Sequence, residues 1–352
     1  MTHGREGLTT TPPGRPLGPG SSWVALAVIV MCALALVTGG CGSDRASSQS
    51  ASLSAVIKPL QNPFFATMRD GLVQTAKQHK VRISVRAALA LQDAAGQASA
   101  LESLIDKGAD CYIVNPIDQS NLIPPLGGVA APIVNIESPI DLMAAHAAGV
   151  RITTYIGSDN IAAGLLAARA MASRVGTRAR VAVIVGMPGD AGSTARAQGF
   201  TEGARGRFTV VGPVAADFDR KQAHDAALEL IRGPKGIDGI FAVNDEMALG
   251  AVDASRELGE NGNVDVIGMD GIPEALAAIR GGELSATVAQ YPFTMAQLGV
   301  EACLAANRGK TIPPTIRPPI QLVTQRNVAR AQRNLPRPVE HFKDPLTTLL
   351  GG

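Results

Sequence analysis

Short apolar runs rich in β-branched residues alternate along the chain with longer segments whose apolar positions recur at helical spacing. This alternation is typical of parallel sheets built from strand–helix–strand units. The runs fall into two similar series of about 100 residues each, which predicts an α/β protein with two Rossmann-like, doubly wound lobes. In the first series we expect strands at 55–58, 81–85, 110–115 and 132–137, and helices near 63–78 and 93–107.

The second series is expected to begin with a strand at 153–156. A helix near 294–308, a proline-rich stretch and a final strand at 320–323 follow the series. The residues after 330 show no clear period and are expected to form an irregular tail. Within the series we expect strands at 180–185, 209–211, 239–243, 265–269 and 285–289, and helices near 162–173, 193–206, 220–232, 245–258 and 272–280.

An apolar run of fifteen residues begins at Trp23. A transmembrane helix needs about 20 residues, so the length better suits the hydrophobic region of a secretory signal. The small residues 38–40 directly precede Cys41, as in the lipobox of bacterial lipoproteins, whose cysteine is lipidated. We predict a signal peptide over 1–40, lipidation of Cys41 and a flexible tether over 41–53. Plain secretion and an uncleaved anchor are the alternatives.

Composition narrows the classes of partner. The formal net charge is only +2, and aromatic residues make up 3% of the chain. A near-neutral balance lacks the basic patch of a nucleic-acid-binding protein, and so few aromatics do not form a stacking platform for single strands. We therefore expect no nucleic-acid partner. The apolar fraction of 46% is enough for a sizeable core.

Four cysteines occur in the chain. Cys32 would leave with the signal peptide, and Cys41 would carry lipid. Cys111 begins an apolar strand and Cys303 lies in a late helix, where buried free thiols are the simplest expectation. An oxidising exterior also permits a disulfide between them, so the sequence leaves both states open.

Polar side chains follow the carboxyl ends of several predicted strands. Ligands of open parallel sheets bind at this edge, and planar polar groups there favour a hydroxyl-rich small molecule. The alternative is that these residues cap helices and loops. We prefer this alternative for Asp245, which stands where an N-cap or a first-turn acid belongs. The candidate ligand-binding residues near these strand ends are Lys58, Asn62, Glu137, Ser138, Asn244, Asp270 and Gln290, with Arg196 from a helix and Phe218 from a loop.

Several catalytic interpretations find no support in the motifs. The glycine-rich loop 186–193 lacks the spacing of phosphate-binding and dinucleotide-binding loops, so we interpret it as a loop that lines the cleft. The five histidines are not spaced as metal ligands, and no calcium loop or nucleophile elbow occurs. We expect no catalytic residues, no metal and no cofactor, with an enzyme as a minor alternative.

Seven short motifs, taken together and in order, resemble the ribose-type periplasmic sugar-binding proteins. Each motif alone is weak, but their ordered combination over residues 54–325 is specific. The motifs are Asn62-Pro63-Phe64-Phe65, Asn115-Pro116, Ser158-Asp159-Asn160, Ala216-Asp217-Phe218-Asp219-Arg220, Asn244-Asp245-Glu246-Met247-Ala248-Leu249-Gly250, Met269-Asp270-Gly271 and Ala289-Gln290.

This resemblance implies two lobes that close on a sugar. It implies a monomeric, extracytoplasmic protein that passes its ligand to the permease of an ABC importer with a separate ATPase. A receptor subunit that presents a sugar-like signal to a membrane sensor is the alternative, and a sugar-responsive repressor is disfavoured because a signal segment replaces the DNA-binding helices. The implied units are a first lobe of 54–156 plus 291–319, a second lobe of 157–290 plus 320–330, a tail of 331–352, and hinge crossings near Gly157, Tyr291 and Ile320.

The resemblance also implies ligand roles for individual residues. Two departures from the ribose pattern occur. Glu137-Ser138 stands where an Asp-Arg pair is usual, and Lys58 replaces a small polar residue. Lys58 and Glu137 would face the same cleft and could pair, and the changes favour a tetritol, pentitol or other pentose over ribose. The matching positions are Asn62, Phe64 and Phe65 in the first lobe, and Arg196, Phe218, Asn244, Asp270 and Gln290 in the second lobe and hinge.

Overall fold

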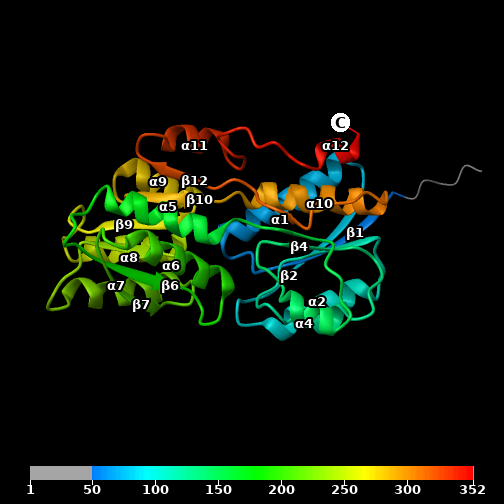
Figure 1. Cartoon of the computed structure of the whole chain (residues 1–352), viewed down its shortest axis with the longest axis horizontal. Coiled ribbons are helices and arrows are strands. Elements are labelled where there is room, and N and C mark those ends of the chain that lie inside the picture. Colours follow the sequence, from blue (N-terminus) through cyan, green and yellow to red (C-terminus); the bar gives the residue numbers. More distant parts are fainter. Residues whose placement is uncertain (1–49, 352) are drawn as a thin grey trace, which may run out of the picture. The chain divides into compact units, whose positions relative to one another are not determined.

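The computed structural model describes residues 50–351, and the predicted signal peptide and Cys41 lie outside them. The described residues form two six-stranded sheets with helices packed against them (Figure 1). The predicted α/β architecture with two doubly wound lobes is therefore confirmed. No helix within 50–351 is long and apolar enough to cross a membrane.

The first sheet has the strand order β11-β5-β4-β3-β1-β2, and all its neighbouring strands are parallel. Its central strands are buried along almost their whole length because helices cover both faces, whereas the edge strand β2 alternates between exposed and half-buried residues. The strands are β1 (Ser52–Ile57), β2 (Arg82–Ala87), β3 (Cys111–Val114), β4 (Ile133–Ile136), β5 (Thr154–Ile156) and β11 (Thr315–Ile316).

The first lobe also contains the last long helix of the chain, which packs on α1. The chain thus returns from the second sheet to the first lobe at this helix. The short helices α3 and α4 were not predicted, because four to six residues are too few to show a helical period. The helices of this lobe are α1 (Pro63–Gln78), α2 (Ala94–Ile105), α3 (Ile123–Leu126), α4 (Leu142–Ala147) and α10 (Pro292–Asn307).

The second sheet has the order β12-β10-β9-β8-β6-β7, in which only β12 runs antiparallel to its neighbour. Its helices pack as the pairs α5–α6 and α7–α8. The strands are β6 (Arg180–Val185), β7 (Thr209–Ala215), β8 (Gly239–Ala242), β9 (Asp265–Asp270), β10 (Ala286–Ala289) and β12 (Gln321–Thr324), and the helices are α5 (Asn160–Ala172), α6 (Ala191–Ala204), α7 (Arg220–Arg232), α8 (Asp245–Glu257) and α9 (Pro273–Gly281).

Aspartate N-caps explain where several helices begin. Asp93, Asp141, Asp159, Asp190 and Asp219 each accept a hydrogen bond from a backbone N–H of the first turn that follows. Such a cap satisfies one of the donors that the first turn leaves without an intrahelical partner. The helix starts therefore follow from local sequence, and they fix the loops that lead into the cleft.

Three boundaries differ from the sequence expectation. The strand at 153–156 is β5, which pairs with β4 and so closes the first series instead of opening the second. β1 begins at Ser52, so the expected tether extends two residues too far. The expected irregular tail contains α12 (Thr347–Leu350) and the second half of α11 (Val328–Asn334). Both helices are too short for a helical period to be recognised in the sequence.

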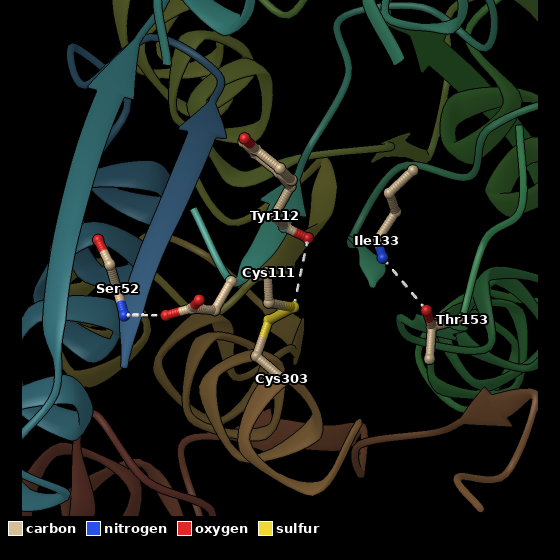
Figure 2. The surroundings of a disulfide bond; sticks show 7 residues. Ser52, Cys111, Tyr112, Ile133, Thr153 and Cys303 are labelled. Atoms are coloured by element: carbon tan, nitrogen blue, oxygen red, sulfur yellow. Dashed lines mark hydrogen bonds between the residues drawn. A yellow bond between two sulfur atoms is a disulfide. The ribbon is translucent and has the colours of Figure 1, made fainter. Parts of the chain in front are cut away.

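A disulfide joins Cys111 on β3 to Cys303 on α10, with Cα atoms 5.7 Å apart (Figure 2). The expectation of two free thiols was therefore wrong, because the packing of α10 beneath the sheet brings the two side chains together. Both cysteines are fully buried. The bond ties the segment that returns from the second lobe to the centre of the first sheet.

Glu301 on α10 is a buried carboxyl that faces the C-terminal residues. Its Oε1 accepts a hydrogen bond from Gln297 Nε2 at 3.0 Å and lies 3.9 Å from His79 Nε2. The pKa of Glu301 is raised to about 8, mainly by burial and also by the nearby Asp344 carboxyl, while Gln297 opposes the rise.

We expect the Glu301 carboxyl to make folding stability fall as the pH rises from 5 to 8. Its pKa in the folded chain lies above the unfolded value, so the stabilisation is present below the unfolded pKa and is lost as the pH rises through the folded one. Glu301→Gln stays neutral and lacks this loss. The melting temperature of the variant relative to wild type should rise by at least about 2 °C between pH 5 and 8. Glu102→Gln on an exposed helix face is the control, and a constant difference for Glu301→Gln would contradict the prediction.

Candidate functional site

A cavity lies between the two lobes, where the carboxyl ends of strands from both sheets meet. Nine of the eleven predicted ligand-binding residues line it. Gln290 lines an adjoining cavity, and Ser138 contacts two of the lining residues. The lining residues are Lys58, Asn62, Phe64, Phe65, Leu91 and Glu137 from the first lobe, and Asp190, Arg196, Phe218, Asn244 and Asp270 from the second.

Lys58 and Glu137 form the charged cluster of the first lobe. Lys58 Nζ lies 3.3 Å from Glu137 Oε2 and donates a hydrogen bond to Ser138 Oγ at 2.5 Å. Ser138 Oγ in turn donates to Glu137 Oε2 at 2.9 Å. Lys58 is 5% exposed, so its ammonium group points into the cleft and not into solvent. The pairing that the sequence suggested is present, and Ser138 completes it.

Asp270 and Arg196 form the matching cluster of the second lobe. Arg196 Nη1 lies 3.6 Å from Asp270 Oδ1, and Gln290 Nε2 donates to the same oxygen at 2.8 Å. The guanidinium group is fixed from behind, because its Nε donates to Asn160 Oδ1 at 2.9 Å and its Nη1 donates to the Val243 carbonyl at 2.8 Å. The cluster therefore presents an aligned carboxylate and guanidinium to the cavity.

Burial dominates the electrostatics of Asp270. It raises the pKa of Asp270 to about 8, and the carboxylates of Asp245 and Glu137 act in the same direction. Arg196 and Gln290 oppose this rise by favouring the charged form. A ligand hydroxyl that donates to Asp270 would also favour the charged form, so the buried carboxyl is a strong acceptor for a polar ligand.

Two asparagines combine a capping role with a place in the cavity. Asn62 Oδ1 accepts from Phe64 N at 2.9 Å and caps α1, and Asn244 Oδ1 accepts from Met247 N at 3.0 Å and caps α8. The capping alternative and the ligand role are thus compatible. The cap occupies the oxygen of each side chain, and the amide N–H groups remain as donors for a ligand.

Aromatic rings supply the apolar walls. Phe64 and Phe65 pack edge to face with ring centroids 5.2 Å apart, and Lys58 Nζ lies 5.6 Å from the centroid of Phe65. Phe218 enters from the second lobe and lies against Gly186, where a Cβ atom would collide with its ring. Gly186, at the start of the loop 186–193, thus leaves the space that the Phe218 ring occupies. Such rings can stack on the C–H faces of a sugar, while the two charged clusters bond its hydroxyls.

Residues 54–311 match the family model of the periplasmic binding protein domain. The chain belongs to the periplasmic binding protein family. The ribose import binding protein of Bacillus subtilis is 32% identical over 306 residues, which cover 86% of this chain and 97% of that protein. The xylitol-binding protein of Mycolicibacterium smegmatis is 28% identical and covers 92% of both chains.

A solved periplasmic binding protein has the same fold. It is an ABC transporter solute-binding protein from Actinobacillus succinogenes with bound D-allose, and it superposes with a TM-score of 0.75 at 29% identity over 80% of this chain and 99% of that one. The resemblance inferred from the motifs is thereby confirmed. Membership of this family implies an extracytoplasmic location.

Strained backbone conformations gather at the cleft of this periplasmic binding protein. Glu137, Phe218 and Asp270 have φ values of 62°, 60° and 130°, in the region that favours glycine. Each lies at or just beyond a strand end and lines the cavity. Because such conformations persist only where the surroundings hold them, their place at the cleft is consistent with side chains that are aimed at a ligand.

The sequence predicted Asp245 at the N-cap or in the first turn of a helix, and the structure confirms the second position. Asn244 is the cap of α8, and Asp245 is the first residue of the helix, fully buried. Its carboxylate accepts from Gly271 N at 2.6 Å, from Ile272 N at 3.0 Å and from Thr287 Oγ1 at 2.7 Å. It therefore anchors the turn that directly follows Asp270. Burial raises the pKa of Asp245 to about 6, and these hydrogen bonds oppose the rise.

Three other contributors to the site were not predicted as individual residues, although Asp190 belongs to the loop 186–193 that was expected to line the cleft. Leu91 and Asp190 line the cavity, and Asn160 orients Arg196. Asn160 belongs to one of the family-like motifs and could have been found there, whereas Leu91 lies in a loop with no local signal. Within 50–351, no group of three or more His, Cys, Asp or Glu side chains is arranged to hold a metal ion. The site is built from hydrogen-bonding groups and aromatic rings.

Proposed function

We propose that this protein captures a sugar or polyol of pentose, pentitol or tetritol size for an ABC importer, and binds it without chemical change. The observation that carries the proposal is the cavity between the lobes. Both of its walls present a buried ion pair, Lys58–Glu137 from the first lobe and Arg196–Asp270 from the second. A ligand that bridges both lobes binds the closed state better, and this difference drives closure.

The first-lobe cluster supports a ligand other than ribose. The resemblance places a guanidinium group at the position of Ser138, and here a small hydroxyl holds Lys58 and Glu137 together. The names of the relatives show that this family accommodates ribose, allose and xylitol in related clefts. Lys58, Glu137 and Ser138 replace the ribose-type residues at these positions. They therefore determine which arrangement of ligand hydroxyls fits the first-lobe side of the cleft.

A ligand screen tests the proposal. The full-length chain, purified in mild detergent, is melted in the presence of tetritols, pentitols, pentoses, hexoses and inositols, and hits are measured by calorimetry. We expect stabilisation by one small group of these compounds. Tight binding of ribose alone would overturn the altered specificity, and no binding by any of them would overturn the proposed function.

We also propose that the protein is anchored to the cell membrane through Cys41, which lies outside the described residues. Support comes from the short apolar run that ends in small residues and this cysteine. Cys41→Ala should release the protein from membranes or leave an unprocessed precursor, as measured by fractionation and intact mass. Normal processing with full membrane retention in this variant would contradict lipidation.

A further inference from the structure

The chain continues beyond the last strand of the second sheet and returns to the first lobe. α11 packs against α9 of the second lobe, and α12 packs against α10 of the first. Figure 1 shows this C-terminal segment, residues 328–350, beginning beside α9 and ending beside α10. It lies beyond the matched residues 54–311. The chain passes between the sheets three times, after β5, β10 and β11, and the segment is a fourth connection between the lobes.

One end of the segment is anchored to the second lobe. Asn327, at the start of α11, accepts from Thr324 N at 2.8 Å and donates to the Leu322 carbonyl at 2.9 Å. Val328 and Ala331 are buried where α11 meets the lobe. These contacts fix the helix on the edge strand β12.

The other end is anchored to the first lobe. The guanidinium group of Arg337 lies 5.2 Å from the centroid of the Phe293 ring on α10. Leu346 is fully buried, and Arg308 Nη1 donates to the Leu350 carbonyl at 2.9 Å. Leu346 N donates to Asp344 Oδ1 at 2.7 Å, which fixes the turn that leads into α12. Apolar burial, a cation–π contact and hydrogen bonds thus hold this end.

The segment crosses from one lobe to the other beside the cleft. Leu335 and Pro336 line a cavity of about 170 Å³ together with Phe64 of the first lobe and Asp270 of the second. Phe64 and Asp270 also line the ligand cavity, which measures about 40 Å³. Because residues of both lobes line these cavities together, the lobes face each other closely here, and both anchorages are formed in this closed arrangement.

We propose that residues 328–350 act as a strap that favours the closed cleft and thereby raises the affinity for ligand. The crossing lies beside the hinge crossing near Tyr291, since Leu335 and Pro336 line the adjoining cavity with Gln290 and Pro292. We infer that a change in the angle between the lobes strains the short segment between the two anchorages. The strap therefore shifts the population toward the closed state, and apparent affinity follows the closed fraction. Its effect on affinity rests on the proposed function, whereas its effect on closure does not.

The test loosens the crossing without removing either anchorage. Six Gly/Ser residues are inserted between Asn334 and Leu335, which adds about 13 Å of flexible reach. The control is the same insertion between Gly127 and Gly128, in an exposed turn of the first lobe. Spin labels on noncanonical ketone side chains at Leu89 and Lys221, which are 79% and 81% exposed, report the distance across the cleft mouth in the full chain.

We expect the strap insertion to shift the free protein toward longer distances, and the control insertion to leave the distances unchanged. With D-ribose, D-allose or xylitol, whichever the unmodified protein binds, we expect Kd to rise about tenfold for the strap insertion only. Equal distance distributions in the strap variant and the unmodified protein would overturn the strap, with or without a ligand. If none of the three compounds binds the unmodified protein, the distance measurement alone decides the strap, and the ligand screen decides the proposed function.

Discussion

Asp270→Ala will weaken ligand binding about 10- to 150-fold. A hydrogen bond to a charged group contributes about 1.5–3 kcal/mol, and Asp270 offers such a group inside a closed cavity. Arg196→Ala will have an effect of the same size, because it removes the partner that favours the charged form of Asp270. Calorimetry with the ligand found by the screen measures both.

A melting measurement and a control variant separate an effect on binding from an effect on folding. Asp270→Ala also leaves the buried Arg196 guanidinium group without its carboxylate, so binding is measured at a temperature at which the melting curve shows the variant to be folded. Asp225→Ala on the exposed face of α7 serves as the matched control and should bind normally. Near-native affinity in both Asp270→Ala and Arg196→Ala would mean that the ligand binds elsewhere.

The combined Lys58→Met/Glu137→Gln variant will lose less binding free energy than the sum of the losses of Lys58→Met and Glu137→Gln alone. Glu137→Gln alone leaves a buried ammonium group without its carboxylate, and a broken buried pair costs about 3–5 kcal/mol, whereas replacing the whole pair costs far less. A double-mutant cycle by calorimetry should show a coupling free energy of about 1–3 kcal/mol. Additivity within about 0.5 kcal/mol would refute a functional pair.

Much of the cleft could be predicted because its residues stand at positions that local sequence defines. Asn62 and Asn244 sit where a strand ends and a helix begins, and Asp270 ends a buried strand. Parallel sheets bring such positions to one edge, so strand order alone gathers them. Lys58 and Glu137 were paired for the same reason, since β1 and β4 both belong to the first sheet.

The features that were missed depend on contacts between distant segments. The partners of Asp245 lie 26 and 42 residues further along the chain, at Gly271 and Thr287, so no local pattern shows them. The pairing of Cys111 with Cys303 depends on the returning helix α10. The C-terminal helices are seven and four residues long, and they are ordered by the lobes they contact, not by their own propensity.

The position of the disulfide in the sequence also determines when it can form during synthesis and export of the chain. Its two cysteines are 192 residues apart, and every strand from β6 to β10 lies between them. Closing so long a loop restricts the unfolded chain by on the order of 5 kcal/mol. Cys303 can meet Cys111 only after strands β6 to β10 of the second lobe have been synthesised and the chain through Cys303 has reached an oxidising compartment. The disulfide is therefore expected only in protein that has been exported through Cys303. Gel electrophoresis without reductant detects it as a difference in mobility from the reduced protein.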